Sequence, residues 1–183
     1  MNKQELRTKF KNIRNNVNFK NDKNILIRKN FIDLFLLKYK TFFVYKSFSS
    51  EVDTEGIIND LFNNNKNVLI PKCDIKTEIM NPVEISRSNS FELNAYGIAE
   101  VCTDEISEKK IDVIILPGLV FDKKGYRVGY GKGYYDKFID SLEYKPKLVG
   151  LAYDEQIIDS IDDINRYDVK LDCVITDRKI YYF

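Results

Sequence analysis

Residues 116–136 gather the residue types that could bind a phosphate group. This stretch holds five of the eight glycines of the 183-residue chain. Three of them are separated by Tyr130 and Lys132, namely Gly129, Gly131 and Gly133. Because glycine adopts positive φ angles and lets the backbone approach a ligand, successive N–H groups here can form an anion-binding concavity. We therefore predict an anionic ligand, since a hairpin leading into a helix does not require three alternating glycines.

Charged side chains accompany these glycines. Arg127 brings a planar, permanently charged group and Lys132 a mobile ammonium group. Asp136 supplies a hard oxygen ligand of the kind that holds Mg²⁺ beside a nucleotide. The cations, the glycines and the carboxylate all lie within ten residues, so the stretch predicts a compact phosphate site.

The stretch matches neither of the common phosphate-binding motifs. Gly125 and Gly131 are one residue too far apart for a Walker loop, and Gly133 stands where Ser or Thr would hold the metal. A dinucleotide fingerprint would place the third glycine one residue later and would follow a buried strand. Residues 122–125 instead have the sequence of a turn, Asp-Lys-Lys-Gly.

The same stretch resembles the signature of a known enzyme family. The resemblance is to 5-formyltetrahydrofolate cyclo-ligase, also called methenyltetrahydrofolate synthetase, and it extends over Leu116-Pro117-Gly118 and Gly125-Tyr126-Arg127-Val128-Gly129-Tyr130-Gly131-Lys132-Gly133-Tyr134-Tyr135-Asp136. It implies an enzyme that uses ATP and Mg²⁺ to close 5-formyltetrahydrofolate into 5,10-methenyltetrahydrofolate, with release of ADP and phosphate. ATP would phosphorylate the formyl oxygen, and the second folate nitrogen would then displace the phosphate.

The resemblance also implies roles for the residues of the stretch. Lys132 and Arg127 would be the catalytic cations that hold and neutralise the transferred phosphate. ATP would contact Arg127, Val128, Gly129, Tyr130, Gly131, Lys132, Gly133, Tyr134 and Tyr135. The folate would contact Tyr130, Gly131, Lys132, Gly133 and Tyr134. Asp136 would bind Mg²⁺.

Five further residues match the family's pattern elsewhere in the chain. The pair Lys3 and Arg7 would contact ATP. Glu51, in the loop of residues 47–54, would accept hydrogen bonds from the pterin, and Lys46 would line the same pocket. Asp168 would join Asp136 at the metal.

The residue pattern leaves ordinary structural roles open for several of these side chains. Lys3, Arg7, Lys11 and Arg14 follow one helical rhythm, and a basic face of this kind is commonly only solvated. Only the first two match the family, so Lys11 and Arg14 could equally be surface charges. Glu51 could be an exposed loop acid.

Three other assignments stay open in the same way. Asp168 could be a turn-forming aspartate, with Asp172 as the rival metal ligand. Tyr135 could belong to the core or to the site. The segment of residues 97–101 has Val101 where the family usually has proline, so the conformation of this substrate-side loop is not defined.

Composition excludes several classes of function. The chain has no histidine, which excludes imidazole catalysis, Ser/His triads and histidine-rich metal sites. Its three cysteines are widely spaced, as expected for reduced thiols rather than for a disulfide scaffold or a zinc site. Twenty-nine basic and 28 acidic residues give a net charge of +1, so no general basic field predicts a nucleic-acid partner.

Nothing in the sequence predicts a secretory signal or a membrane anchor. Residues 1–6 are charged and no apolar run follows them, and the richest apolar patch, residues 31–37, is short. We expect a soluble, cytoplasmic protein that acts as a monomer on small molecules, ATP and a reduced folate.

Four helices are predicted from apolar spacing. The buried faces are formed by Leu6, Phe10, Ile13 and Val17 in the first; by Ile27, Phe31, Leu34 and Phe35 in the second, over about residues 23–38; by Ile57, Ile58, Leu61 and Phe62 in the third; and by Tyr134, Tyr135, Phe138, Ile139 and Leu142 in the fourth. The third helix would be capped by Asp53-Thr54.

Strands are predicted between these helices. They cover residues 41–48, 67–71, 111–117, 147–153 and 173–176, with edge strands at 78–85 and 179–183, and residues 86–100 would be irregular. The alternation predicts a single three-layer α/β domain over residues 1–183 with a mostly parallel central sheet. The resemblance implies the sugar-isomerase and CoA-transferase-like architecture.

Two other functions fit the same residues. One is another enzyme that uses ATP or a sugar phosphate, which would use the glycine loop but not Glu51. The other is a non-catalytic protein that binds folate or a nucleotide without consuming ATP.

Overall fold

A seven-stranded sheet forms the centre of the computed structural model, which describes residues 1–74, 76–93, 99–103 and 105–183. The strand order is β12-β11-β9-β6-β1-β2-β3, and the four pairs between β11 and β2 are parallel. The strands are β1 (Thr41–Phe43), β2 (Asn67–Asp74), β3 (Ile79–Ile85), β6 (Val113–Leu116), β9 (Lys147–Leu151), β11 (Cys173–Ile175) and β12 (Ile180–Tyr182). Each of the two edge strands pairs antiparallel with its neighbour in the sheet, β3 with β2 and β12 with β11. The mostly parallel sheet is confirmed.

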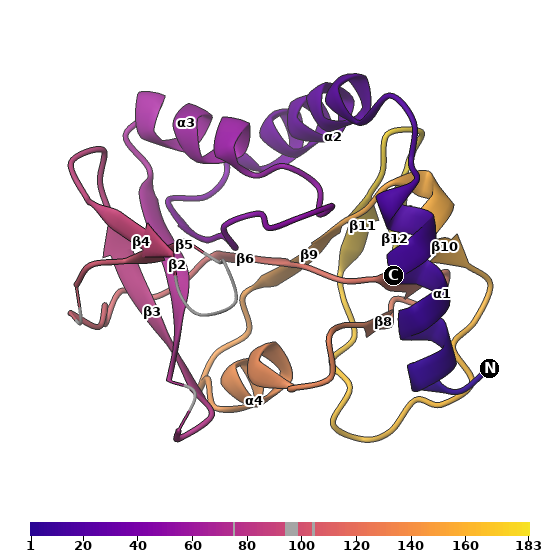
Figure 1. Ribbon diagram of the computed structural model, residues 1–183. Helices are drawn as coiled ribbons and strands as arrows, with labels where there is room; N and C mark the ends of the chain where they lie inside the picture. The colour runs from indigo at the N-terminus through magenta and orange to yellow at the C-terminus, as the bar shows by residue number, and fades with distance from the viewer. Residues whose placement is uncertain (75, 94–98, 104) are drawn as a thin grey trace.

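Helices cover both faces of this sheet, as Figure 1 shows. On one face, α2 (Lys20–Phe35) and α3 (Glu55–Asn63) bury their apolar stripes against alternate strand residues such as Phe42 and Val113. On the other face, α4 (Tyr134–Asp140) packs Phe138 and Ile139 against Phe43 and its neighbours. Because parallel strands are buried on both faces, β6 reads as an unbroken apolar run, and it lies at the middle of the sheet.

A third apolar cluster joins α1 (Lys3–Asn15) to a small sheet beside the main one. That sheet has the order β10-β7-β8, with β7 (Val120–Asp122), β8 (Arg127–Val128) and β10 (Ile157–Ile158). Leu6 and Phe10 of α1 pack on Val120 and Val128. The first helix therefore lies against the hairpin that carries the glycine-rich stretch (Figure 1).

The helix bounds differ from the predicted ones where local backbone geometry decides. The second helix begins at Lys20, after Phe19 in a left-handed conformation (φ +55°), and ends at Phe35, whose carbonyl accepts two N–H groups from the following turn. It was predicted about three residues later in the chain. Of the predicted cap Asp53-Thr54, the Asp53 carboxylate accepts the N–H of Glu55, the first residue of α3, at 3.2 Å, whereas no side-chain cap is made by Thr54. Its hydroxyl donates instead to the carbonyl of Tyr45, so it holds the preceding loop.

The predicted strand over residues 41–48 ends at Phe43. Only Val44 continues toward the sheet, through its N–H to the carbonyl of Leu69, and the chain then leaves as a loop. Residues 86–100 were predicted as irregular, yet β4 (Phe91–Leu93) and β5 (Ala99–Val101) form a small antiparallel pair there. Of the predicted loop at residues 97–101, the first two lie outside the described residues.

The loops that follow the parallel strands meet at one edge of the sheet. Strand β1 leads into residues 44–54, β6 into 117–119, and β9 into the short helix η1 (Asp154–Gln156). Because β1 and β6 are parallel neighbours, their following loops lie side by side. Open α/β sheets generally bind their ligands at such an edge.

Candidate active site

A hairpin presents the glycine-rich stretch to this edge. Strands β7 and β8 pair antiparallel, and the turn between them has Gly125 at φ +96°, as the Asp-Lys-Lys-Gly sequence predicts. The buried carboxylate of Asp122 accepts N–H groups of Lys124 and Tyr126 at 3.0 and 2.8 Å and of Ile161 at 2.9 Å. These bonds fix the turn from its inner side. The hairpin thus fixes where the glycine loop begins.

Two of the three alternating glycines adopt the conformation that requires them. Gly131 has φ +101° and Gly133 has φ +68°, where a side chain would be strained. A Cβ atom on Gly131 would also come within 3.1 Å of the guanidinium of Arg7. Gly129 has no positive φ, and a Cβ atom there would meet nothing within 4 Å. The predicted need for glycine is confirmed at two positions.

The first helix closes over this loop through Arg7. Its Nε donates to the carbonyl of Gly129 at 3.0 Å, and its Nη1 to the side-chain oxygen of Gln4 at 3.3 Å. The N-terminal cation and the glycine loop, 122 residues apart in the chain, are therefore in direct contact. The two parts of the predicted ATP site lie together.

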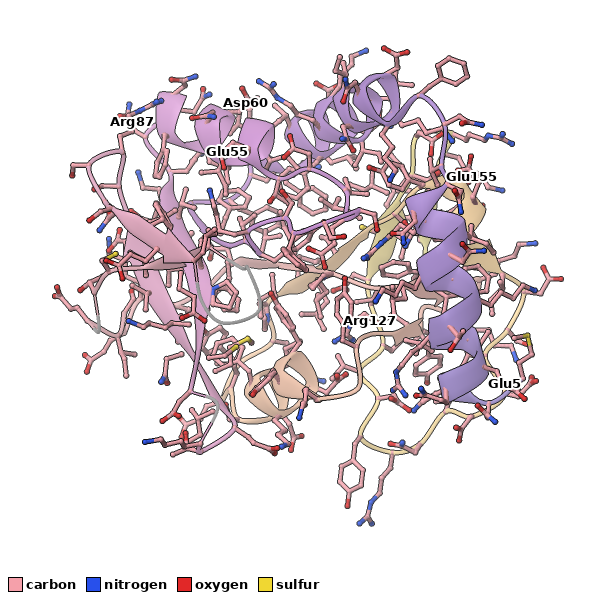
Figure 2. All side chains as sticks on the ribbon, viewed as in Figure 1. Glu5, Glu55, Asp60, Arg87, Arg127 and Glu155 are labelled. Carbon is pink, nitrogen blue, oxygen red and sulfur yellow. The ribbon has the colours of Figure 1, made fainter. Side chains whose placement is uncertain are left out.

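Arg127 and Asp136 form an ion pair at the base of the loop. The two guanidinium N–H groups donate to the two carboxylate oxygens, both at 3.2 Å. The Arg127 side chain is only 5% exposed, and Figure 2 shows it between α4 and α1. Asp136 also accepts the N–H of Val169 at 3.2 Å, which brings the segment around Asp168 to its side.

Lys3 and Asp168 form the second ion pair of this region. The ammonium group lies 2.9 and 2.6 Å from the two carboxylate oxygens. Asp168 also accepts the N–H of Asn165 at 2.7 Å, so it forms a turn and contacts a site residue at once. The rival candidate, Asp172, instead binds Lys147 and the N–H of Leu148 at the start of β9. It lies at the opposite edge of the sheet.

Lys132 is exposed at the tip of the loop. The turn between β2 and β3 carries Glu78, which pairs with Lys137 of α4. The pKa of the Glu78 carboxyl lies below its usual value, chiefly through a hydrogen bond from Lys137 and least through the charge of Lys132. The charge of Lys132 therefore contributes only weakly at Glu78.

Glu51 lies in the loop after β1 and is buried, with 8% of its side chain exposed. One carboxylate oxygen accepts the N–H of Phe48 at 2.9 Å, and the other accepts the hydroxyl of Tyr130 at 3.0 Å. Burial raises the pKa of the carboxyl, while the Phe48 N–H, the Arg14 charge and the Tyr130 hydroxyl oppose that rise. The alternative of an exposed loop acid is wrong.

Tyr130 connects this loop to the glycine loop. Its ring is half exposed, and burial together with the Glu51 charge raises the pKa of its hydroxyl to about 12. The hydroxyl also accepts a hydrogen bond at 2.5 Å from Arg14, which is 2% exposed. The alternative that Arg14 is a surface charge is therefore wrong, whereas Lys11 on the same helix is exposed.

The remaining predicted residues lie around this centre. Lys46 pairs with Glu55 at 2.5 Å and lies 4.9 Å from the ring of Phe91. Val128 is buried in the cluster under α1, so only its backbone is available to a ligand. Tyr134, the first residue of α4, packs against the apolar cluster that α4 covers.

Tyr135 packs in the core, and a role of its hydroxyl in the site stays a prediction. Its ring packs against apolar clusters on both faces of the sheet, while its hydroxyl is buried and makes no hydrogen bond within the part of the chain described. Burial, followed by the charge of Glu51, raises the pKa of this hydroxyl well above its usual value. Arg127 Nε is likewise buried and unpaired within the described residues. Such unsatisfied groups are uncommon in folded proteins and point to a partner that a ligand or water supplies.

The number of carboxylates in this region limits which metal ion could bind. Within residues 1–74, 76–93, 99–103 and 105–183, no group of three Asp, Glu, Cys or His side chains could hold an ion. Asp136 and Asp168 lie on adjoining segments and each is paired with a cation. Two carboxylates fit Mg²⁺, which keeps several waters and takes phosphate oxygens as ligands.

A family model describes almost the whole chain. The model of the 5-formyltetrahydrofolate cyclo-ligase family matches residues 1–177. The chain belongs to this family. The cyclo-ligase signature is thus part of a likeness that extends from α1 to the segment after β11.

Named relatives and solved structures agree with the family. The chain is 35% identical to the 5-formyltetrahydrofolate cyclo-ligase of Mus musculus over 72% of this chain and 70% of that protein. It is 28% identical to the 5-formyltetrahydrofolate cyclo-ligase of Escherichia coli K12 over 75% of this chain and 78% of that protein. The 5,10-methenyltetrahydrofolate synthetase of Aquifex aeolicus has a similar structure, with TM-score 0.83, 26% identity and coverage of 100% and 93%. That of Mycoplasma pneumoniae gives TM-score 0.75, 26% identity and coverage of 97% and 99%.

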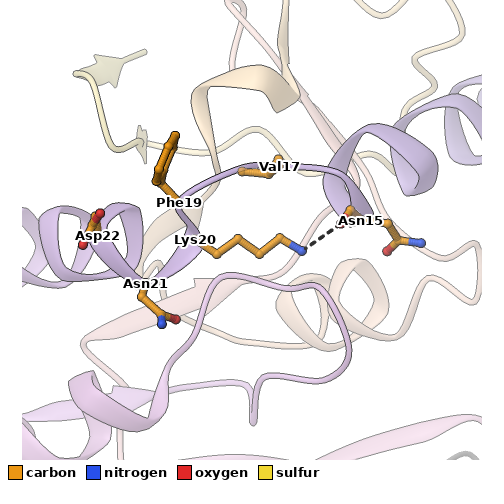
Figure 3. Close-up of a pocket in the computed structure, with 6 residues that line it drawn as sticks. All are labelled: Asn15, Val17, Phe19, Lys20, Asn21 and Asp22. Carbon is orange, nitrogen blue, oxygen red and sulfur yellow. Dashed lines mark hydrogen bonds between the residues drawn. The ribbon is translucent and has the colours of Figure 1, made fainter.

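A surface depression lies at the connection between α1 and α2. Figure 3 shows its lining, which includes Val17 and Phe19 and a hydrogen bond from Lys20 to the carbonyl of Asn15 at 3.3 Å. It contains none of the predicted site residues. None of the helices in the described ranges has the length and apolar character needed to cross a membrane.

Sequence reasoning missed one part of the site. Arg14 donates to Ser50, to the carbonyl of Gly118 and to Tyr130, and so links α1 to three loops. In the sequence, Arg14 was marked only by its helical spacing from the other basic residues of α1, and Lys11 has the same spacing. Burial distinguishes the two residues, and the sequence pattern alone does not.

Proposed function

We propose that this protein closes 5-formyltetrahydrofolate into 5,10-methenyltetrahydrofolate at the expense of ATP. The observation that carries the proposal is the 3.0 Å hydrogen bond from Tyr130 to Glu51. It joins the loop that resembles the family's phosphate site to the carboxylate that resembles its folate ligand, across 79 residues of chain. A transfer from ATP to folate needs both sites at one place, and this contact supports that requirement.

The nucleotide lies on the side of α1. Lys3 and Arg7 bind its phosphates together with the glycine loop, and the unpaired Nε of Arg127 adds a buried donor. Lys132, exposed and mobile, reaches the transferred phosphate. The contact of Arg7 with Gly129 supports this arrangement, because it brings the N-terminal cation to the loop backbone.

The folate lies on the side of Glu51. Each carboxylate oxygen accepts one protein hydrogen bond, which leaves further lone pairs for the amino and ring N–H donors of the pterin. Lys46 and the rings of Tyr130 and Tyr134 line the same pocket. A carboxylate that accepts hydrogen bonds and aromatic rings that stack can orient the pterin, because the pterin is flat and carries several N–H donors.

The reaction is a phosphoryl transfer followed by ring closure. The formyl oxygen attacks the γ-phosphorus, the bond to ADP breaks, and the activated carbon accepts the lone pair of the second folate nitrogen. Phosphate then leaves with the formyl oxygen, and that nitrogen loses its proton. Positioning and charge neutralisation by Arg127 and Lys132 supply the catalysis, so the absence of histidine is no obstacle.

Mg²⁺ is proposed as the metal, held by Asp136 and Asp168. When bound, it neutralises charge on the phosphate oxygens. The finer predictions of a sugar-isomerase and CoA-transferase-like architecture, a single domain over residues 1–183, a monomeric state and a cytoplasmic location remain proposals. Light scattering of the purified protein tests the monomer.

The test mixes purified protein with 5-formyltetrahydrofolate, ATP and Mg²⁺ and follows the near-ultraviolet absorbance of the methenyl product. We expect growth of that band only with ATP. Both ligands binding without growth of the band would favour a non-catalytic binding protein. Turnover of a sugar phosphate in a substrate screen, without turnover of the folate, would favour the other enzyme class.

A further inference from the structure

Arg14 is a buried cation that the proposed reaction does not use. It lies on α1, two turns beyond Arg7, and is 2% exposed. A buried guanidinium needs acceptors for its N–H groups, because an unpaired buried charge is strongly unfavourable. The groups that accept hydrogen bonds from Arg14 identify the segments that this residue holds in place.

Three segments supply those acceptors. Nε donates to the hydroxyl of Ser50 at 3.1 Å, Nη1 to the carbonyl of Gly118 at 3.1 Å, and Nη2 to the hydroxyl of Tyr130 at 2.5 Å. Ser50 belongs to the loop after β1, Gly118 to the loop after β6, and Tyr130 to the glycine loop. The planar guanidinium therefore fixes these three loops relative to one another.

The contact with Tyr130 also fixes the direction of a proton. A guanidinium can only donate, so the Tyr130 hydroxyl accepts from Arg14 and its own proton is free for another acceptor. That acceptor is Glu51, whose nearer oxygen lies 3.0 Å from the hydroxyl. The same oxygen lies 3.9 Å from Arg14 Nη1, so the guanidinium also faces the carboxylate directly.

We propose that Arg14 is a positioning residue for folate, which holds Tyr130 as the hydrogen-bond donor to Glu51 and so aims the free lone pairs of that carboxylate at the pterin. This inference rests on the proposed function, because it takes Glu51 as the folate ligand. It predicts that Arg14 acts on folate recognition through Tyr130. ATP recognition, which uses Lys3, Arg7 and the glycine backbone, does not depend on it.

A double-mutant cycle of Arg14→Lys and Tyr130→Phe tests the link. Lysine keeps the buried charge but cannot reach three acceptors in the fork geometry, and phenylalanine removes only the hydroxyl. Each single variant is expected to raise the KM for 5-formyltetrahydrofolate about tenfold and leave the KM for ATP within about twofold. The double variant is expected to be no worse than Tyr130→Phe alone, because both changes break one chain of hydrogen bonds.

Lys11→Ala is the matched control, since it removes an exposed cation from the same helix and is expected to leave both KM values unchanged. Effects that multiply in the double variant would overturn the inference, as would equal increases in both KM values. Where Arg14→Lys fails to fold, Ser50→Ala replaces it, because it removes one acceptor and keeps the guanidinium.

The cycle is also measured as the dissociation constant of 5-formyltetrahydrofolate by calorimetry, without ATP. If the wild type binds folate without turnover, the proposed reaction is contradicted. The dissociation constants of the variants would then still test the role of Arg14. Absence of wild-type folate binding would overturn both proposals. Wild-type turnover with independent effects of the two substitutions would overturn only the role of Arg14.

Discussion

The two sides of the site hold their charges in different ways. On the α1 side, Lys3 pairs with Asp168 and Arg127 with Asp136, each as a separate ion pair, and Lys132 remains exposed. On the Glu51 side, the buried guanidinium of Arg14, the hydroxyl of the half-exposed Tyr130 and the buried carboxylate of Glu51 form one continuous hydrogen-bonded chain. The first arrangement can exchange partners when a charged ligand enters, whereas the second is already ordered before a ligand binds.

This difference matches the two proposed ligands. A triphosphate with Mg²⁺ brings its own charges, so separate cation–carboxylate pairs, whose partners the phosphates and the metal can replace, suit it. A pterin is flat and almost neutral and is recognised by directed hydrogen bonds, so a preordered acceptor suits it. Substitutions on the two sides should therefore differ in which KM they change and in how they affect stability.

Lys132→Ala should have the largest effect. Removing the cation that meets the transferred phosphate is expected to lower kcat about 100-fold or more. The side chain is exposed, so the thermal midpoint should stay nearly constant. Steady-state kinetics and a thermal melt check both. Lys124→Ala, which removes an exposed cation from the preceding turn, is the control, and a folded Lys132 variant with full turnover contradicts the assignment.

Asp136→Asn should weaken metal dependence. Asparagine keeps the shape but loses the charge that would hold Mg²⁺, so half-maximal activity is expected to need about tenfold more Mg²⁺. A titration of rate against Mg²⁺ at saturating ATP measures the change. Asp140→Asn, an exposed change on the same helix, should leave the curve in place. An unaltered curve for Asp136→Asn would refute its metal role.

Glu51→Gln should act on folate alone. The amide cannot accept as strongly as a carboxylate, so the KM for 5-formyltetrahydrofolate is expected to rise about tenfold while that for ATP stays constant. Initial rates over a grid of the two substrates separate these values. The exposed Glu143→Gln serves as control. An equal rise in both KM values would show that the two sides are not separate.

The same substitution should change how stability depends on pH. Burial raises the pKa of Glu51 above its ordinary value of 4.5, so the folded protein binds this proton more tightly than the unfolded chain does. Its contribution is fully present below pH 4.5 and is lost as the pH rises through the raised pKa. The thermal midpoint of the wild type, relative to Glu51→Gln, should therefore fall over that window. A constant or rising difference would contradict the buried state of the carboxyl.

Lys3→Met should have the smallest effect. The Lys3–Asp168 pair is partly exposed, so its loss is expected to cost at most about 1 kcal/mol of stability. The KM for ATP should rise a few-fold and that for folate should not change. Lys11→Met controls for the loss of positive charge on the helix. A rise confined to the folate KM would place Lys3 on the wrong side of the site.

The sequence predicts the sheet better than it predicts the site. Continuous apolar runs such as β6 and stripes such as that of α3 depend on local periodicity, and both were found where expected. The ends of α2 and β1 depend on a left-handed Phe19 and on a loop held by Thr54, which periodicity does not encode. Arg14 and Lys11 have the same kind of side chain in one rhythm, and only the position of α1 against the three loops distinguishes them.

The central claim is that one site brings the formyl oxygen to the γ-phosphate of ATP. The most direct measurement uses 5-formyltetrahydrofolate with ¹⁸O in the formyl group and analyses the released phosphate by mass spectrometry after one turnover. The account predicts that the phosphate carries the label, because the formyl oxygen leaves bound to phosphorus. Unlabelled phosphate, with the ¹⁸O recovered in water, would contradict it.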